Sequence, residues 1–285
     1  MPSAENALPL RHAVALGLLQ GPAELLPVSS SAHTTLIPWL AGWPYARLDG
    51  ERRKSFEVAL HAGAGLAIAL HMRGELLHDA ARLDRRRAGV IALAVGPPVL
   101  AGYALGPPIE RRLGGPRSIA AGLIGGAIAM ALADAMAPSG GHPAADGTEV
   151  GRGRAQEDAS ARDGLALGLA QAGALIPGVS RNGATLTAAR ARGFGRSAAQ
   201  ALSWHAGLPV ILGASVLKGA RMRRAGVPRE QRAALALGAA SAFLSTLAAA
   251  TGTRRLWREA RSLLPYALYR CLLAALVLAR LRDAA

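Results

Sequence analysis

The chain alternates between long apolar runs and short polar or basic segments. The apolar runs consist mostly of Ala, Leu, Gly and Val with almost no charge, and they cover residues 58–70, 88–105, 118–137, 164–177, 206–217, 233–251 and 263–279. Several approach the roughly 20 residues that an α-helix needs to cross the hydrocarbon core of a bilayer. A soluble helix would place charged residues along its exposed face. The pattern therefore predicts an all-α integral membrane protein with several membrane-spanning helices.

The charged residues lie mainly between these runs. The chain has a formal net charge of +15, and its arginines cluster in segments such as Arg85–Arg87, Arg221–Arg224 and Arg254–Arg255. Membrane loops have such clusters where they meet anionic lipid headgroups. Aromatic residues make up only 4% of the chain and do not alternate with the arginines. We therefore expect membrane lipids as partners and no binding of nucleic acid.

Two pairs of similar stretches indicate an internal repeat. The stretch "LLQGPAELLPVSSSAHTTL" begins at Leu18, and "LAQAGALIPGVSRNGATLT" begins at Leu169. A second pair, "LHAGAGLAIAL" and "WHAGLPVILGA", follows in the same order. Each pair is separated by about half the chain. We therefore expect a single polytopic domain of two duplicated halves, residues 8–137 and 163–285, joined by a solvated linker at 138–162.

Each half begins with an interrupted segment and continues with three longer apolar runs. Duplicated halves with such broken segments often form inverted repeats around a central site. Broken backbone at membrane depth is tolerated only where protein or a water-filled cavity satisfies its polar groups. We therefore expect a helical bundle of two inverted repeats, each with a broken or re-entrant helix pair. The basic loops 73–87 and 218–232 occupy equivalent places, so the positive-inside rule leaves the orientation open.

The first polar motif combines a possible cation site with nucleophiles. Gln20 and Glu24 are four residues apart and share one face of a helix, and their oxygens suit a hard divalent cation such as Mg²⁺. Pro27 then ends the helix. The stretch "VSSSAH" offers the hydroxyl groups of Ser29, Ser30 and Ser31 and the imidazole of His33. Either a serine or the histidine could attack, and the other could transfer a proton.

The second motif, "PGVSRNGAT", favours binding of an anion. It places Ser180, Arg181 and Asn182 on a turn flanked by Gly178 and Gly183, before an expected helix. Free backbone N–H groups at a helix start bind anions, and a guanidinium matches two phosphate oxygens. A carboxylate site opposite an arginine site predicts the binding of a pyrophosphate.

Structural interpretations remain open for several of these residues. An ionisable side chain inside a membrane segment is costly, so Glu24 and Arg181 are functional candidates, although an ion pair joining the two halves would also explain them. Glu57 and His61 are spaced like a pair of metal ligands, but two ligands make a weak signal, and support of the cavity wall is the simpler explanation.

At these motifs the chain resembles the bacterial undecaprenyl-pyrophosphate phosphatases, the bacitracin-resistance family of integral membrane enzymes. That family has a Glu/Gln-x-x-x-Glu segment running into Pro-x-Ser-Ser-x-x-His, which matches "QGPAELLPVSSSAH". Its second signature, Pro-Gly-x-Ser-Arg-x-Gly-Ala-Thr, matches "PGVSRNGAT". Weaker similarity continues in "KSFEVALHAG", "LSWHAGLPVILGA" and "LPYALYR". The resemblance therefore covers most of the chain in order.

The resemblance implies a multi-pass enzyme of the bacterial plasma membrane. It implies removal of the terminal phosphate from undecaprenyl pyrophosphate, which recycles the lipid carrier for cell-wall synthesis, with a divalent cation, Mg²⁺ or Ca²⁺. By position, Gln20 and Glu24 match the metal-associated pair and His33 the catalytic histidine. Ser30 matches a candidate nucleophile and Arg181 the phosphate-binding arginine. Glu24 acting as the base is a further alternative.

Some residues depart from the family pattern and keep other functions open. Gln20 is the less acidic option at its position, Ala32 replaces a usual glycine, and Asn182 replaces a common serine. His61 and His205 replace residues that are typically uncharged. A transporter or flippase for the polyprenyl phosphate, or a lipid-binding paralogue with altered catalysis, would use the same charges. The sequence also leaves open whether the chain forms a homodimer.

Overall fold

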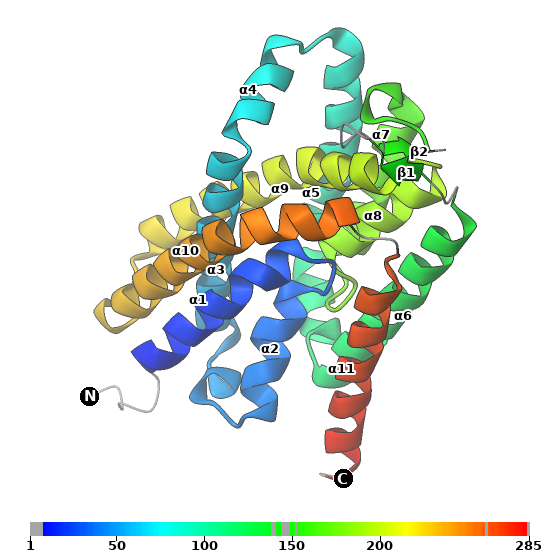
Figure 1. Ribbon diagram of the computed structural model, residues 1–285. Helices are drawn as coiled ribbons and strands as arrows, with labels where there is room; N and C mark the ends of the chain where they lie inside the picture. The colour runs from blue at the N-terminus through cyan, green and yellow to red at the C-terminus, as the bar shows by residue number, and fades with distance from the viewer. Residues whose placement is uncertain (1–7, 138–140, 144–148, 152, 260–261, 284–285) are drawn as a thin grey trace.

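The computed structural model describes residues 8–137, 141–143, 149–151, 153–259 and 262–283. Its helices are α1 (Leu10–Leu25), α2 (Ser30–Leu40), α3 (Gly50–His71), α4 (Arg73–Ala81), α5 (Arg85–Leu113), α6 (Pro116–Met136), α7 (Ala161–Gly173), α8 (Arg181–Ala191), α9 (Arg196–Ala225), α10 (Arg229–Glu259) and α11 (Leu264–Arg282). Two 3₁₀ turns, η2 (Pro44–Arg47) and η3 (Gln156–Asp158), and a short antiparallel pair of strands, β1 (Gly141–Pro143) and β2 (Glu149–Gly151), complete the described elements (Figure 1). The predicted all-α class is thus confirmed apart from this hairpin.

Five helices are long and apolar enough to cross a membrane, namely α5, α6, α9, α10 and α11. A sixth span is available if α3 and α4 count together, because they meet at a bend of 68° next to Met72. The predicted multi-pass membrane protein is therefore confirmed by length and composition. The apolar run 164–177 does not give such a span, because α7 ends at Gly173.

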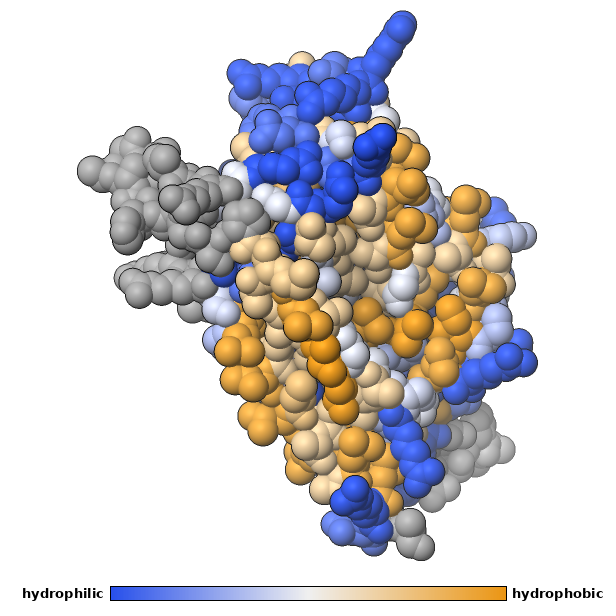
Figure 2. Space-filling view, turned by 90° about the vertical axis from the view of Figure 1, so that its right-hand side faces the viewer, coloured by the Kyte–Doolittle hydropathy of each residue, from blue (hydrophilic) through white to orange (hydrophobic). Residues whose placement is uncertain are grey.

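The surface agrees with this assignment. Figure 2 shows hydrophobic residues gathered in the middle of one face, between hydrophilic residues toward its upper and lower ends. Many large apolar side chains on the spanning helices are exposed, for example Leu100 and Tyr103 on α5 and Leu272 on α11. Exposed apolar side chains on long helices are expected where lipid replaces water as the solvent.

The helices of the two halves follow a similar order, except that the bent pair α3 and α4 stands where the second half has the single helix α9. A pair of short helices, α1–α2 or α7–α8, comes first, and longer helices follow. The helix α1 packs along α10 of the other half, and α7 packs along α5. Both contacts are close because they use glycine: a side chain on Gly17 would collide with the carbonyl of Gly238, and one on Gly168 with the carbonyl of Leu93. The first short pair of each half is thus fixed against a long helix of the other.

A buried ion cluster fixes α8 against the long helices. Asp134 on α6 accepts hydrogen bonds from Arg190 Nε and Arg196 Nε, both at 2.9 Å. Its second oxygen accepts from the backbone N–H of Leu263, also at 2.9 Å. Asp134 is 3% exposed. Because a buried charge is stable only when it is paired and hydrogen-bonded, this cluster holds α6, α8, α9 and the start of α11 together.

The predicted linker 138–162 contains more structure than expected. Its described residues include the hairpin of β1 and β2, the turn η3 and the first residues of α7. Arg154, at its end, pairs with Phe194 in an isolated bridge and donates two hydrogen bonds to Asp163, at 2.7 and 3.0 Å. This segment is therefore attached to both ends of the α7–α8 pair, which a pattern without periodicity could not indicate.

Candidate functional site

The turn between α1 and α2 has a strained backbone. Pro27 ends the first helix, because a residue before proline disfavours the helical conformation, and Leu26 is extended. Ser29 then has a φ of 74°, in the left-handed region. A non-glycine residue in a sparsely populated region costs about 1–3 kcal/mol and often marks a functional site. The result is that α2 begins at Ser30, directly beside the last turn of α1.

The turn between α7 and α8 repeats this conformation. Ser180 has a φ of 70°, and Ser29 and Ser180 are the only non-glycine residues with positive φ in the described part of the chain. The hydroxyl of Ser180 accepts a hydrogen bond from the N–H of Gly183 at 3.1 Å, which caps the new helix. Arg181 is therefore the first residue of α8, with its side chain at the turn.

Glu24 connects the two turns. Its Oε1 lies 3.0 Å from Nη2 of Arg181, which is 157 residues away in sequence. Its Oε2 accepts a hydrogen bond from Ser30 Oγ at 2.6 Å. His61 Nδ1 and Gln20 Nε2 each lie 3.1 Å from the same oxygen. Glu24 is 5% exposed, so this carboxylate is a buried charge with four polar neighbours.

The guanidinium of Arg181 has a hydrogen-bonded partner at Nη2, which is Glu24, but none at Nη1 among the described residues. Its Cζ lies 5.3 Å from the centre of the Trp204 ring, within the range of a cation–π contact. Nη1 lies against Gly207, where a Cβ would overlap it, and is buried without a hydrogen-bond partner among the described residues. The group thus keeps unused donors beside its ion pair with Glu24.

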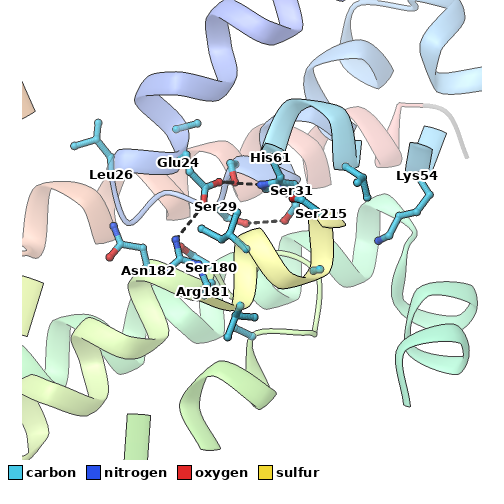
Figure 3. A pocket seen from close by; sticks show the side chains of 17 residues that line it. Glu24, Leu26, Ser29, Ser31, Lys54, His61, Ser180, Arg181, Asn182 and Ser215 are labelled. Atoms are coloured by element: carbon cyan, nitrogen blue, oxygen red, sulfur yellow. Dashed lines mark hydrogen bonds and ion pairs between the residues drawn. The ribbon is translucent and has the colours of Figure 1, made fainter. Parts of the chain in front are cut away.

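Glu24, Ser30, His61 and Arg181 line a cavity of about 270 Å³. Figure 3 shows Glu24, Ser29, Ser31 and His61 on one side and Ser180, Arg181 and Asn182 on the other, with Ser215 of α9 beside them. The sequence prediction that the two motifs face each other across a cavity therefore agrees with the structure. The cavity also has apolar walls from Val58, Val210 and Ile211.

Three predicted substrate-binding residues hold the turn, and of these only Asn182 lines the cavity. Asn182 donates to the carbonyl of Leu25 at 3.1 Å and accepts from Ser203 at 2.7 Å, so its side chain is occupied. Gly178 has a φ of 95° and lies against Ile119 of α6. Gly183 lies against the side chain of Arg270. Gly178 and Gly183 are not among the residues that line the cavity. Their contact with substrate stays a prediction.

His33 lies apart from the serine it was predicted to assist. Its Nδ1 is 2.8 Å from the carbonyl oxygen of Ser29, and its Nε2 is 2.6 Å from the hydroxyl of Tyr269. Because a carbonyl only accepts, Nδ1 has the proton, and in the neutral imidazole Nε2 then accepts from Tyr269. His33 is 2% exposed and is not among the cavity residues. This geometry fits a residue that supports the strained turn at Ser29.

Arg270 of α11 is a further residue at the site that sequence reasoning did not single out. It is fully buried, and its Nη2 donates to the carbonyls of Gly178 and Val179 at 3.0 and 2.8 Å. An arginine inside the apolar run 263–279 was the available signal, because ionisable residues within membrane segments are costly. Tyr269, which contacts His33, comes from the same turn of α11.

The donors around Glu24 fit a divalent cation in part. The described residues contain no group of three or more His, Cys, Asp or Glu side chains suited to a metal ion. Glu24 and the carboxamide of Gln20 would supply the oxygen ligands, and Gln20 Oε1 is buried without a partner among the residues that the structure describes. The side chains of Gln20 and Glu24, the predicted pair, are therefore adjacent, and Gln20 Oε1 is the oxygen that remains without a hydrogen bond.

The fold and the site together define a multi-pass membrane protein with a buried carboxylate, a hydroxyl and a guanidinium around one cavity. The family model for the bacitracin resistance protein BacA matches residues 13–276. The chain belongs to this family.

Curated relatives cover nearly the whole chain. An undecaprenyl-diphosphatase of Geobacter sulfurreducens is 38% identical over 95% of this chain and 98% of the relative. A second, of Geobacter metallireducens, is 36% identical over 94% of this chain and 96% of the relative. A third, of Thermomicrobium roseum, is 35% identical over 82% and 84%. The resemblance read from the sequence motifs is thus confirmed.

Proposed function

We propose that this chain hydrolyses undecaprenyl pyrophosphate to undecaprenyl phosphate and inorganic phosphate. Relatives that match nearly its whole length are named for this activity. The observation that supports it most directly is the 2.6 Å hydrogen bond from Ser30 Oγ to Glu24, which pairs a nucleophile with a base at the cavity. Recycling of the lipid carrier for cell-wall synthesis follows from this reaction.

Ser30 attacks the terminal phosphorus in this mechanism. Its hydroxyl proton passes to Glu24 as the Oγ–P bond forms and the anhydride P–O bond breaks, so that undecaprenyl phosphate leaves. Water then attacks the phosphoserine, the P–Oγ bond breaks and inorganic phosphate leaves, while the proton held by Glu24 returns to Ser30 Oγ and regenerates the base. Glu24 is thus the base, one of the alternatives that the sequence left open.

Arg181 binds the phosphate oxygens. In the structure Nη2 of Arg181 donates a hydrogen bond to Glu24 Oε1 at 3.0 Å. A phosphate oxygen would accept this hydrogen bond in place of Glu24. When phosphate replaces Glu24 there, the carboxylate loses a counter-charge and becomes a better proton acceptor. Substrate binding would therefore activate the base. Positioning and charge neutralisation dominate phosphoryl transfer, which is why Arg181 matters as much as the nucleophile.

A divalent cation at Gln20 and Glu24 is part of the proposal. When bound, it would neutralise charge on the pyrophosphate oxygens. The family resemblance implies Mg²⁺ or Ca²⁺, which take oxygen ligands. His33 would assist indirectly, by holding the Ser29 carbonyl at 2.8 Å and so keeping the turn that presents Ser30.

Transport of the polyprenyl phosphate is not favoured. A transporter needs the charges of Glu24 and Arg181 but no hydroxyl bonded to the carboxylate, and the curated relatives are named diphosphatases. Contact of the exposed apolar helices with membrane lipids follows from the spans, and formation of a homodimer stays a prediction.

The function is tested by phosphate release from undecaprenyl pyrophosphate by the purified protein in detergent, where no sidedness exists. We expect Ser30→Ala to lower the rate by about 10³-fold or more. The neighbouring Ser31→Ala is the matched control and should stay within about threefold. A Ser30→Ala variant near wild-type activity would exclude Ser30 as the nucleophile. Absence of release from folded wild-type protein with any divalent cation would contradict the function itself.

We also propose that the two halves are inverted repeats and that α1–α2 and α7–α8 are re-entrant. The outer ends of each pair lie together, which supports hairpins that enter and leave on one side. His12 at the start of α1 stacks on Trp43 after α2, with ring centres 4.2 Å apart. Asp163 at the start of α7 lies 2.7 Å from Arg192 at the end of α8. Each contact thus joins the start of the first helix of a pair to the segment that follows the second helix, at similar places in the two motifs.

The contacts between the halves also support a two-fold relation. Exchange of the halves converts the contact of α1 with α10 into that of α7 with α5, and both are observed. Figure 1 shows α1 and α2 in the lower part of the molecule and α7 in the upper part. Single cysteines at Leu10, Gly42 and Ala191, after replacement of Cys271, test this by labelling in sealed vesicles. Leu10 and Gly42 should label from one side and Ala191 from the other; labelling of Leu10 and Gly42 from opposite sides would contradict the re-entrant pair.

A further inference from the structure

Besides Ser30 and Gln20, His61 is a third side chain that contacts Oε2 of Glu24. Its Nδ1 lies 3.1 Å from Glu24 Oε2 and 3.0 Å from Gln20 Nε2. Gln20 Nε2 lies 3.1 Å from the same Glu24 oxygen. The three atoms therefore form a nearly equilateral triangle, built from one turn of α1 and one residue of α3.

This spacing is that of three ligands on one face of an octahedron. Two ligands at right angles with bonds of about 2.1 Å lie about 3.0 Å apart. The remaining positions of such a cation would be filled by water or by phosphate oxygens. Glu24 and His61 both line the cavity, so these positions would be open to it.

Gln20 can supply oxygen to this face. Its Oε1 is buried without a partner among the described residues, while Nε2 points at Glu24 and His61. The two ends of a carboxamide are nearly the same size, so rotation of the group by 180° exchanges them. In that orientation the triangle consists of two oxygens and one imidazole nitrogen, with no N–H of Gln20 facing a cation.

We propose that Gln20, Glu24 and His61 bind one divalent cation together, and that the imidazole makes the site prefer a first-row transition cation over Mg²⁺ and Ca²⁺. Imidazole suits such cations, whereas oxygen ligands alone suit Mg²⁺ and Ca²⁺. The inference rests on the proposed function and deepens it, because the cation is the one that would neutralise the pyrophosphate. It assigns His61 a role as a ligand, where the sequence favoured only support of the cavity wall.

The repeat provides a matched control. His205 is the counterpart of His61 in the second half, but it pairs with Asp79 and lies in a separate cavity near His78 and Arg86. Its carboxylate partner, Asp79, lies at Nε2 and its carboxamide neighbour, Gln156, lies at Nδ1, so the two do not form a triangle with one ring nitrogen as Glu24 and Gln20 do. Substitution of His205 removes a histidine from the chain without changing the triangle.

The first test is a titration of the purified, tag-free full chain with Co²⁺, followed by visible absorption and by competition with Mg²⁺. We expect wild type to bind Co²⁺ at least about tenfold more tightly than Mg²⁺. His61→Gln should weaken Co²⁺ binding by about tenfold or more, and His205→Gln should bind like wild type. Equal Co²⁺ affinity of His61→Gln and wild type would overturn the inference.

A second test needs no variant. X-ray absorption at the cobalt edge of the Co²⁺-loaded wild type should show the scattering pattern of one imidazole, and a shell of oxygens alone would overturn the inference. Both tests need no substrate. Imidazole ligation without phosphate release would contradict only the proposed function, and phosphate release with an oxygen-only shell would contradict only the inference.

Discussion

The two broken helix pairs share a backbone conformation and differ in their chemistry. Ser29 and Ser180 occupy matching places in the motifs, and their φ values are 74° and 70°. The first pair contributes a carboxylate and a hydroxyl, Glu24 and Ser30, whereas the second contributes the guanidinium of Arg181. Because the carboxylate and the guanidinium come from different halves, their ion pair forms only where the two halves meet.

The side chains that fasten the two turns are also different. His33 binds the carbonyl of Ser29 in the first pair, while Arg270 binds the carbonyls of Gly178 and Val179 in the second. The two halves thus share the backbone turn, whereas the side chains that stabilise the turn differ between them. Changes at the reactive groups should therefore reduce catalysis, and changes at the fastening groups should reduce stability.

Among the changes that test this comparison of the two pairs, the largest expected effect comes from replacing the guanidinium of Arg181 by a different positive group. Arg181→Lys keeps one positive charge but loses the planar fork that reaches Glu24 and lies near Trp204. We expect kcat/KM for phosphate release to fall by about 10²- to 10³-fold. The measurement is steady-state phosphate release in detergent with saturating divalent cation.

The same substitution at the other end of α8 is the control. Arg192 pairs with Asp163 at 2.7 Å and its side chain is 43% exposed. Arg192→Lys should keep kcat/KM within about threefold of wild type. If Arg181→Lys were equally mild, Arg181 would be an ordinary counter-ion that joins the halves, and the structural interpretation of this residue would be the correct one.

Much of the fold could be predicted from composition, because the cost of charge in lipid shapes the sequence. The runs 88–105 and 233–251 lie within α5 and α10, and the runs 118–137 and 263–279 each exceed α6 and α11 by one residue. The boundaries could not be predicted, since a helix continues beyond the apolar core: α5 begins at Arg85 and α9 continues through the basic cluster to Ala225. The bend at Met72 has no proline or glycine at that residue to signal it.

The charged residues of the site could be predicted from the sequence, but the hydrogen-bond partners of its polar side chains could not. Glu24 and Arg181 stood out because buried ionisable groups are expensive, and their contact at 3.0 Å agrees with that reasoning. The hydrogen-bond partner of Ser30 could not be predicted from the motif, because helical periodicity does not give the backbone conformation of the turn at Ser29. That turn directs Ser30 to Glu24 and leaves His33 facing Tyr269.

A smaller effect is expected at the outer ends of the two pairs. Asp163 is 1% exposed on its side chain and binds Arg154 and Arg192. Burial would raise the pKa of this carboxyl, but the guanidinium groups and the Ser160 hydroxyl hold the pKa well below its usual range. A lowered native pKa stabilises the fold fully at neutral pH, and this contribution is lost as pH falls below about 4 toward the native pKa.

Asp163→Asn should therefore lower the free energy of unfolding by about 2–3 kcal/mol, less than for a fully buried pair because Arg154 and Arg192 can turn toward water. His12→Ala, which removes the stack on Trp43 at the corresponding end of α1, should cost about 1 kcal/mol. Thermal unfolding in detergent at pH 7 and pH 2 measures both. The difference between the variants should shrink at pH 2, because this pH is well below the usual pKa of the carboxyl and close to the lowered pKa of Asp163, so the His12→Ala protein has then lost most of this contribution as well. Equal losses at both pH values would mean that the two hairpins are closed by packing alone, and that the charged fastening of α7–α8 adds no stability to the turn that presents Arg181.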